Sequence, residues 1–147
     1  MLFLNGTAFT IGYARFLDSS THKREGSAKV YVPIRVEGIE LLAQLDTGAA
    51  WSILPSEVCE VLNLLNGTGP KVPVTTRKGR FEGRLERLCV TLVAAEGVSL
   101  DVDATILVLP DWDDDAFLGW SGLLERVRTA LDPGQYTNYF YFGPVAA

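Results

Sequence analysis

The sequence is poor in the residues on which many enzyme mechanisms depend. It has one histidine and two cysteines among 147 residues. A zinc site needs several His or Cys ligands, and a Ser-His-Asp triad needs a His held by a third group. His22 lies in a polar stretch that we interpret as an exposed loop, which argues against both mechanisms. We expect neither a metal nor a cofactor.

Long apolar runs and disulfide motifs are also missing. Cys59 and Cys89 are far apart and form no Cys-x-x-Cys motif, so we expect two buried thiols in a reducing compartment. Residues 1–10 lack the basic start of a secretory signal and contain the turn signal Asn5-Gly6. No apolar run approaches the roughly 20 residues of a membrane span. These features predict a cytoplasmic protein with no membrane partner.

Basic residues are outnumbered, and the formal net charge is -5. Phosphate binding requires a basic surface, so we expect no nucleic-acid partner. Apolar residues make up 48% of the chain and charged residues 21%, which is typical of a globular protein. The length indicates one domain, residues 1–147, with a sizeable core.

Most of the chain has the alternating pattern and the turn punctuation of short strands. The pattern predicts a hairpin within 2–13, a loop over 14–28, and strands over 29–36, 39–45, 71–76, 81–93, 98–108 and 139–142. Pro33 has no amide hydrogen, so we expect its strand to be an edge strand or to contain a bulge. Helical spacing predicts two short helices, over 55–65 and 121–131. The fold class is therefore all-β, a small closed barrel or a sandwich.

One motif stands out, Leu45-Asp46-Thr47-Gly48-Ala49, and it occurs once. The apolar run before it predicts a strand that delivers the Asp46 carboxylate onto a tight turn. One carboxylate alone does little hydrolytic chemistry, whereas two facing carboxylates activate a water and protonate a carbonyl. No second Asp-Thr-Gly or Asp-Ser-Gly is present, so a catalytic pair requires a second copy of the chain. The simpler interpretation is a turn in which Asp46 bonds its own backbone.

Two other motifs are weaker. Gly119-Trp120-Ser121-Gly122 lacks the glycine spacing of a nucleophile elbow, and we interpret Ser121 as a helix N-cap. Asp111-Trp112-Asp113-Asp114-Asp115 lacks the spacing and the glycine of an EF-hand, so we interpret it as a solvated loop rather than a calcium site. Neither motif predicts a second reaction centre.

Residues 45–54 resemble the active-site loop of the retroviral-type, or retropepsin-like, aspartic proteases. About seventy residues on, Ala116-Phe117-Leu118-Gly119 resembles the second signature of that family, in which two apolar residues and a glycine precede the C-terminal helix. The hairpin around Gly79 lies where the family has its flap. The resemblance covers roughly residues 29–142. The block from Phe117 to Asp132, with the aromatic strand after it, is similar to single-domain retropepsin-like proteins of bacteria. It implies a small closed acid-protease barrel with a flap hairpin and one or two short helices.

The resemblance implies a role for each residue of the loop. Asp46 would supply one carboxylate of a catalytic dyad and its symmetry mate the other, in a homodimeric endopeptidase that acts on peptides or proteins. Thr47 would lock the two loops together. Gly48 would let the substrate backbone approach closely, and Ala49 would be small for the same reason.

The neighbouring residues are expected to support this loop. The second signature would pack beneath it through Phe117, Leu118 and Gly119. Ser52 either bonds near the loop or acts as an ordinary turn hydroxyl. Trp51 and Trp120 are expected in the core or at an interface.

The predicted flap departs from the family because it is basic. It consists of Arg77, Lys78, Gly79, Arg80 and Phe81, whereas viral flaps are Gly-rich and apolar at the tip. Either these charges only solvate an exposed hairpin, or they favour acidic peptides or meet Asp113-Asp114-Asp115 of the partner subunit.

Both chain ends are apolar, Leu2-Phe3-Leu4 and Tyr139-Phe140-Tyr141-Phe142. In the family the termini of two subunits interleave in one sheet, so we expect a dimer to cover ends that a monomer would expose as strand edges. Two alternatives stay open. The chain is a non-catalytic dimeric peptide-binding or scaffold module of the same fold, or a small monomeric β protein in which Asp-Thr-Gly is accidental.

Overall fold

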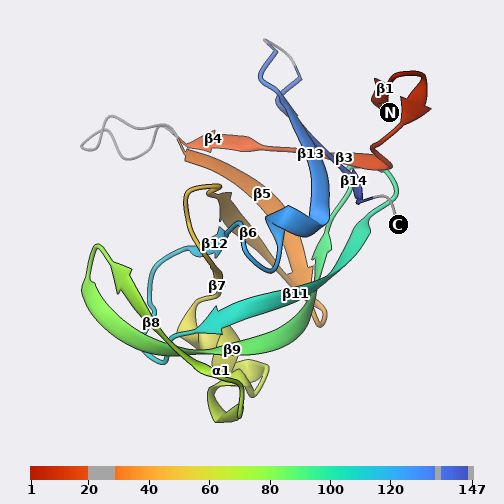
Figure 1. The fold of residues 1–147 in the computed structure, drawn as a ribbon. Coiled ribbons are helices and arrows are strands. Elements are labelled where there is room, and N and C mark those ends of the chain that lie inside the picture. Colours follow the sequence, from red (N-terminus) through yellow and green to blue (C-terminus); the bar gives the residue numbers. More distant parts are fainter. Residues whose placement is uncertain (20–28, 135–136, 146–147) are drawn as a thin grey trace.

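The computed structural model describes residues 1–19, 29–134 and 137–145, and strands dominate it (Figure 1). In chain order the strands are β1 (Phe3–Leu4), β2 (Thr7–Ala8), β3 (Gly12–Arg15), β4 (Leu17–Ser19), β5 (Lys29–Val36), β6 (Ile39–Leu45), β7 (Ser52–Ile53), β8 (Lys71–Thr76), β9 (Gly79–Leu92), β10 (Glu96–Gly97), β11 (Leu100–Val108), β12 (Ala116–Leu118), β13 (Val127–Asp132) and β14 (Tyr139–Pro144). The helical elements are α1 (Ser56–Val61) and two 3-10 turns, η1 (Leu64–Asn66) and η2 (Leu124–Arg126). The fold class is all-β, as the alternating sequence pattern predicts.

The larger sheet closes on itself. Its strand order is β4-β5-β6-β12-β7-β11-β9-β8, and β5 also pairs with β9, which joins the strands from β5 to β9 into a ring. Because β4 and β8 branch from this ring, the arrangement is less regular than a simple closed barrel. The strand β12 runs parallel to β6, so Leu118 at the end of β12 lies beside Leu45 at the end of β6.

The main hydrophobic core lies inside this ring. Alternate residues of each strand point into it, as in β5, where Val32, Ile34 and Val36 are fully buried. Phe140 and Phe142 of β14 belong to the same cluster. They join the smaller sheet, whose order is β10-β3-β14-β13, to the ring.

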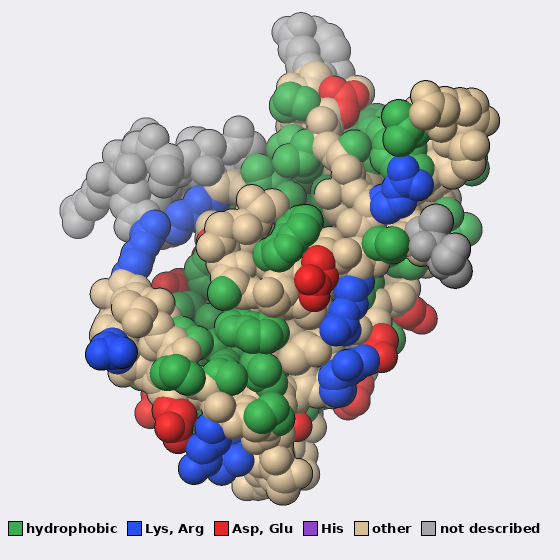
Figure 2. Space-filling model, viewed as in Figure 1, with side chains coloured by type: hydrophobic (Ala, Val, Ile, Leu, Met, Phe, Trp, Pro, Cys, Tyr) green, Lys and Arg blue, Asp and Glu red, His purple; other side chains and the backbone are tan. Residues whose placement is uncertain are grey.

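A second, smaller hydrophobic cluster lies between β7, β11 and the β8–β9 hairpin. It consists of Ile53, Leu107, Leu109 and Trp112, with Trp51, Val72, Val74, Leu85 and Phe117 packed against it. Figure 2 shows hydrophobic side chains gathered over β7 and this hairpin, on the face that Figure 1 presents. The residues packed against this cluster are half-buried, so the cluster reaches the surface on this side.

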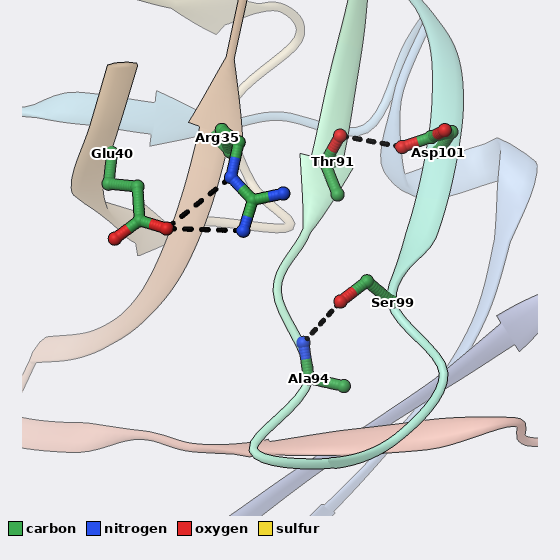
Figure 3. A network of polar contacts seen from close by, with 6 residues as sticks. All are labelled: Arg35, Glu40, Thr91, Ala94, Ser99 and Asp101. Carbon is green, nitrogen blue, oxygen red and sulfur yellow. Dashed lines mark hydrogen bonds and ion pairs between the residues drawn. The ribbon is translucent and has the colours of Figure 1, made fainter. Parts of the chain in front are cut away.

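Polar side chains bridge exposed strand pairs elsewhere (Figure 3). Arg35 of β5 pairs with Glu40 of β6 at 3.1 Å, and the Thr91 hydroxyl donates to Asp101 at 2.6 Å. Such exposed contacts contribute little to stability because water and salt screen them. They are compatible with the observed register, in which Thr91 faces Asp101.

The two predicted hairpins are present. Asn5 and Gly6 join β1 to β2 with φ angles of 51° and 77°, the left-handed conformation that such a tight turn requires. The strands β8 and β9 form the hairpin around Gly79 and pair from Lys71↔Arg84 to Thr76↔Gly79.

The helix predicted over 121–131 is wrong. That segment contains only the short 3-10 turn η2, and the chain then enters β13, which pairs along its whole length with β14. Gly122 has a φ of 78°, which interrupts a right-handed helix at its start, and Ser121 forms a bridge with Trp51 instead of capping a helix. The helix predicted over 55–65 is shorter, since α1 covers Ser56–Val61 and η1 follows it. Among the described residues, no helix is long and apolar enough to cross a membrane.

Two smaller expectations also need correction. Residues 14–19 lie largely in β3 and β4 rather than in a loop, and His22 lies outside the described residues. The strand with Pro33 is an inner strand, but its neighbour on one side changes there from β4 to β9, and the Val93 N–H donates to the Pro33 carbonyl at 3.3 Å. This change of partner is what allows a proline at that position.

The two cysteines are free, but only one is buried. Cys59 lies in the core, where burial raises the pKa of its thiol to about 11. Cys89 is exposed, because its neighbours Leu88 and Val90 face the core and the strand alternates. The expectation of two buried thiols therefore holds for Cys59 alone.

The chain ends differ from the expectation of exposed terminal strands. The strand β14 lies between β3 and β13 of its own chain, so Tyr139–Phe142 is paired on both sides and is not a free edge. In contrast, Phe3 and Leu4 remain 64% and 55% exposed in the β1–β2 hairpin, which projects at the upper right of Figure 1. The strand β14 therefore offers no free edge for pairing with a second chain.

Candidate active site

Asp46 follows directly after β6, at the start of a tight turn. Its backbone N–H donates to the Leu118 carbonyl at 3.0 Å, and its own carbonyl accepts from the Ala49 N–H at 3.1 Å. One carboxylate oxygen, Oδ1, accepts from the Gly48 N–H at 3.0 Å. The last contact is the one that an ordinary Asp turn would have, so on its own it does not indicate catalysis.

The two residues that follow the second signature hold this turn from the other side. The Trp120 N–H donates to the Ala49 carbonyl and the Ser121 N–H to the Ala50 carbonyl, both at 2.9 Å. These backbone bonds leave the Asp46 loop little freedom to move. A plain turn would not need a strand from far along the chain to hold it in this way.

Ser52 and Gly119 form the buried contact under the loop. The Gly119 N–H donates to the Ser52 hydroxyl at 2.8 Å, and Ser52 is 1% exposed. A Cβ atom on Gly119 would lie 2.3 Å from the Trp51 carbonyl oxygen, so only glycine fits. Phe117 and Leu118 lie on β12, Leu118 in the main cluster and Phe117 against the second one.

The loop presents a single carboxylate to the surface. Asp46 and Ala49 are half-buried, while Thr47 and Gly48 are exposed. The carboxylate can accept a proton from a water, but a second acidic group is needed to protonate a carbonyl at the same time. Among the described residues, no group of three or more His, Cys, Asp or Glu is arranged to hold a metal ion.

The tip of the β8–β9 hairpin contacts the acidic loop of its own chain. The Lys78 ammonium lies 2.5 Å from a carboxylate oxygen of Asp113 and 5.5 Å from the centre of the Trp112 ring. The hydrogen bond to Asp113 raises the pKa of Lys78, and the same bond lowers the pKa of Asp113. The opposite charges of the two segments are visible in the sequence, but the contact of Lys78 lies within one chain and not across subunits.

The acidic loop is held at its far end as well. The Tyr31 hydroxyl donates to the Asp115 carboxylate at 2.6 Å, and the Trp112 indole N–H donates to the Asp115 carbonyl at 3.0 Å. Burial, with help from Asp115, raises the pKa of Tyr31 to about 12. No sequence motif marks Tyr31, since its partner lies far along the chain.

A small cavity of about 60 Å³ lies between the hairpin and the acidic loop. Its lining consists of Lys78, Phe81, Glu82, Leu109, Pro110, Asp111 and Trp112. Gly79, Arg80 and Phe81 are exposed at the hairpin, Phe81 to 41%. Of the predicted flap residues, the structure therefore brings Lys78 and Phe81 to the acidic loop.

Comparison with solved structures shows the fold. The chain is similar to a retropepsin-like aspartic protease from Rickettsia conorii, with a TM-score of 0.61 and 18% identity over 90% of this chain and 98% of that chain. The alignment with the simian foamy virus (mac) protease covers 63% of this chain and 89% of that one, at 19% identity and a TM-score of 0.44. No protein-family model matches the sequence, and no similar curated protein is found.

An all-β chain with one Asp-Thr-Gly turn braced by a second signature belongs to the class of protease-like β folds. More specifically, it has the fold of the retropepsin-like aspartic proteases, which confirms at the level of the fold the resemblance inferred from the sequence.

Proposed function

We propose that this chain, as one domain, is a homodimeric aspartic endopeptidase in which each subunit supplies one Asp46. The observation that supports the proposal most is the bracing of the Asp46 turn, whose backbone N–H donates to Leu118 of the second signature. That bracing fixes a carboxylate at the surface, where a symmetry mate can meet it. The retropepsin-like fold is consistent with this chemistry.

The proposed mechanism uses two carboxylates that share one proton. Two such groups within hydrogen-bond distance cannot both ionise at low cost, so one is ionised and the other protonated. The ionised Asp46 takes a proton from a bound water while the protonated one donates to the scissile carbonyl. Water attacks the carbonyl carbon directly, without an acyl-enzyme. The carboxyl that took the proton of the water then gives it to the leaving nitrogen, while the other carboxylate takes a proton from the diol, and the C–N bond breaks to an acid and an amine.

The neighbouring residues support this reaction in the proposal. Thr47 is exposed beside Asp46, where it can bond the partner loop, and Gly48 and Ala49 let the substrate backbone approach. The β8–β9 hairpin serves as the flap over the bound peptide. Because Cys59 and Cys89 are free, we also place the protein in the reducing cytoplasm.

The test is peptide-library cleavage between about pH 4 and pH 7, where carboxylates supply both acid and base. Wild type is compared with Asp46→Asn and with Glu57→Gln, an exposed carboxylate on α1. We expect Asp46→Asn to lose about 1,000-fold or more in rate and Glu57→Gln to lose nothing. Equal cleavage by wild type and Asp46→Asn would overturn the proposal.

The bond from the Gly48 N–H to Asp46 Oδ1 favours one alternative, in which Asp46 only shapes the loop of a peptide-binding module. That module would bind peptides from the same library without cleaving them. Peptide affinity measured alongside cleavage separates the two functions.

A further inference from the structure

The proposed dyad needs a second copy of the chain, and the terminal strand cannot recruit it by pairing. In the smaller sheet β14 has β3 on one side and β13 on the other, so its backbone groups have partners within the chain (Figure 1). A second copy therefore has to dock through another surface. That surface must include the Asp46 loop, because the two carboxylates have to meet.

Trp120 is the largest exposed side chain beside that loop. It is 52% exposed, although its backbone is fixed on both sides. Its N–H donates to the Ala49 carbonyl at 2.9 Å, and its carbonyl accepts from the Glu125 N–H at 3.0 Å. The indole is thus attached to a rigid backbone next to the dyad loop, and a rigid exposed Trp is the type of side chain that dominates binding interfaces.

The surroundings of Trp120 suit contact with an identical surface. Residues 45–52 and 119–122 contain one charged side chain, Asp46. In a twofold-symmetric interface the same patch occurs on both sides, so any charge near the axis faces its own copy. Here the only such charge is the one that a dyad can neutralise by sharing a proton.

Small residues complete this surface. Gly48, Ala49 and Ala50 form the turn, and Gly48 and Ala50 are exposed. With no long side chains between them, two such turns can approach to the hydrogen-bond distance that a shared proton requires. Charged residues are also depleted at the centre of known interfaces, as they are here.

We propose that the surface formed by the Asp46 loop and Trp120 is the docking site for a second copy of this chain, with Trp120 as its apolar anchor. The inference rests on the proposed function, since only a dyad requires the second Asp46. It differs from the family arrangement in that the contact is made by loops and one indole ring rather than by pairing along β14.

The experiment is sedimentation over a range of concentrations, with each variant checked for folding by circular dichroism. The variants are Trp120→Ala, Trp120→Phe, Asp46→Asn and Leu131→Ser. Leu131 is the matched control, because it is 47% exposed but lies on β13, one of the two edge strands of the smaller sheet.

We expect Trp120→Ala to raise the dimer dissociation constant on the order of 30-fold or more, as for an aromatic hot spot. Trp120→Phe keeps most of the affinity, and Leu131→Ser and Asp46→Asn keep dimers. At low concentration Trp120→Ala loses cleavage activity, and raising the concentration restores it.

An unchanged dissociation constant for folded Trp120→Ala overturns the inference, as does dissociation caused by Leu131→Ser instead. In both cases a dimeric, active wild type leaves the proposed function standing. A wild type that stays monomeric at every concentration overturns both. Dimers of Asp46→Asn without cleavage support both.

Discussion

Two exposed turns of this molecule are held in opposite ways. The Asp46 loop is fixed by a backbone hydrogen bond to the Leu118 carbonyl and by two from the N–H groups of Trp120 and Ser121, all in a distant segment of the chain. The tip of the β8–β9 hairpin is held by Lys78, which contacts the exposed carboxylate of Asp113 and the ring of the buried Trp112. The first turn carries the proposed nucleophile-activating carboxylate, and the second carries the proposed flap.

The difference indicates which of the two can move. Backbone bonds over a buried glycine cannot lengthen without leaving polar groups unpaired, which is costly. An exposed ion pair opens at little cost because water and salt replace it. A reaction centre needs the first kind of support and a cover over a substrate needs the second, so the contacts match the proposed roles.

The largest expected effect tests the rigid turn. Gly119→Ala puts a methyl group 2.3 Å from the Trp51 carbonyl oxygen, where only backbone can give way. We expect a loss of about 3 kcal/mol in the free energy of unfolding, measured by urea denaturation. The matched control is Gly48→Ala, whose Cβ meets only the Asp46 carboxylate at 3.3 Å. It should cost under about 1 kcal/mol while still reducing cleavage, and equal stability of the two variants would contradict the comparison.

An intermediate effect tests the hydroxyl under the loop. Ser52→Ala leaves the buried N–H of Gly119 without its acceptor, so we expect a loss of about 2 kcal/mol in stability. Ser99 is a matched control, since its hydroxyl also accepts from a backbone N–H, that of Ala94 at 3.0 Å, but on the exposed surface (Figure 3). Ser99→Ala should cost under about 0.5 kcal/mol. If both variants unfold at the same denaturant concentration, Ser52 does not support the loop.

Local features of this fold could be predicted from the sequence. The Asn5-Gly6 turn and the alternation along β11 depend on neighbouring residues alone. The Asp46 turn is local too, because an apolar strand, an Asp and a Gly follow one another. The bonds from Trp120 and Ser121 to that turn could not be predicted, since backbone bonds between distant segments leave no trace in residue type.

The wrong helix has the same origin. Leu123, Leu124, Val127 and Leu131 have helical spacing, but Val127 and Leu131 equally fit one face of a strand. The segment forms the strand β13 because it pairs with β14 along its whole length. Lys78 is a parallel case, because its charge predicts an acidic partner but not whether that partner lies in the same subunit.

The smallest effect on stability tests the tip of the β8–β9 hairpin. Lys78→Gln and Asp113→Asn should leave the unfolding midpoint unchanged, because the pair is exposed, and should speed amide hydrogen exchange at Arg77–Arg80 several-fold. Lys78→Gln should also increase cleavage of bulky substrates if the contact holds the flap. The control Lys71→Gln removes an exposed pair with Glu82 at the base of the same hairpin and should leave exchange at the tip as it is.

The contact between Lys78 and Asp113 at the hairpin tip should depend on pH. The pKa of Asp113 is lowered by Lys78, so the contact is complete above the ordinary value of 3.8 and is lost as the pH falls through the lowered one. The pKa of Lys78 is raised, so at the alkaline end the contact is complete below 10.5 and is lost as the pH rises through the higher value. Exchange at the tip, corrected for the intrinsic pH dependence, should therefore be slow between these limits and faster outside them. In Asp113→Asn the acidic rise should disappear, and its persistence would show that another group holds the hairpin.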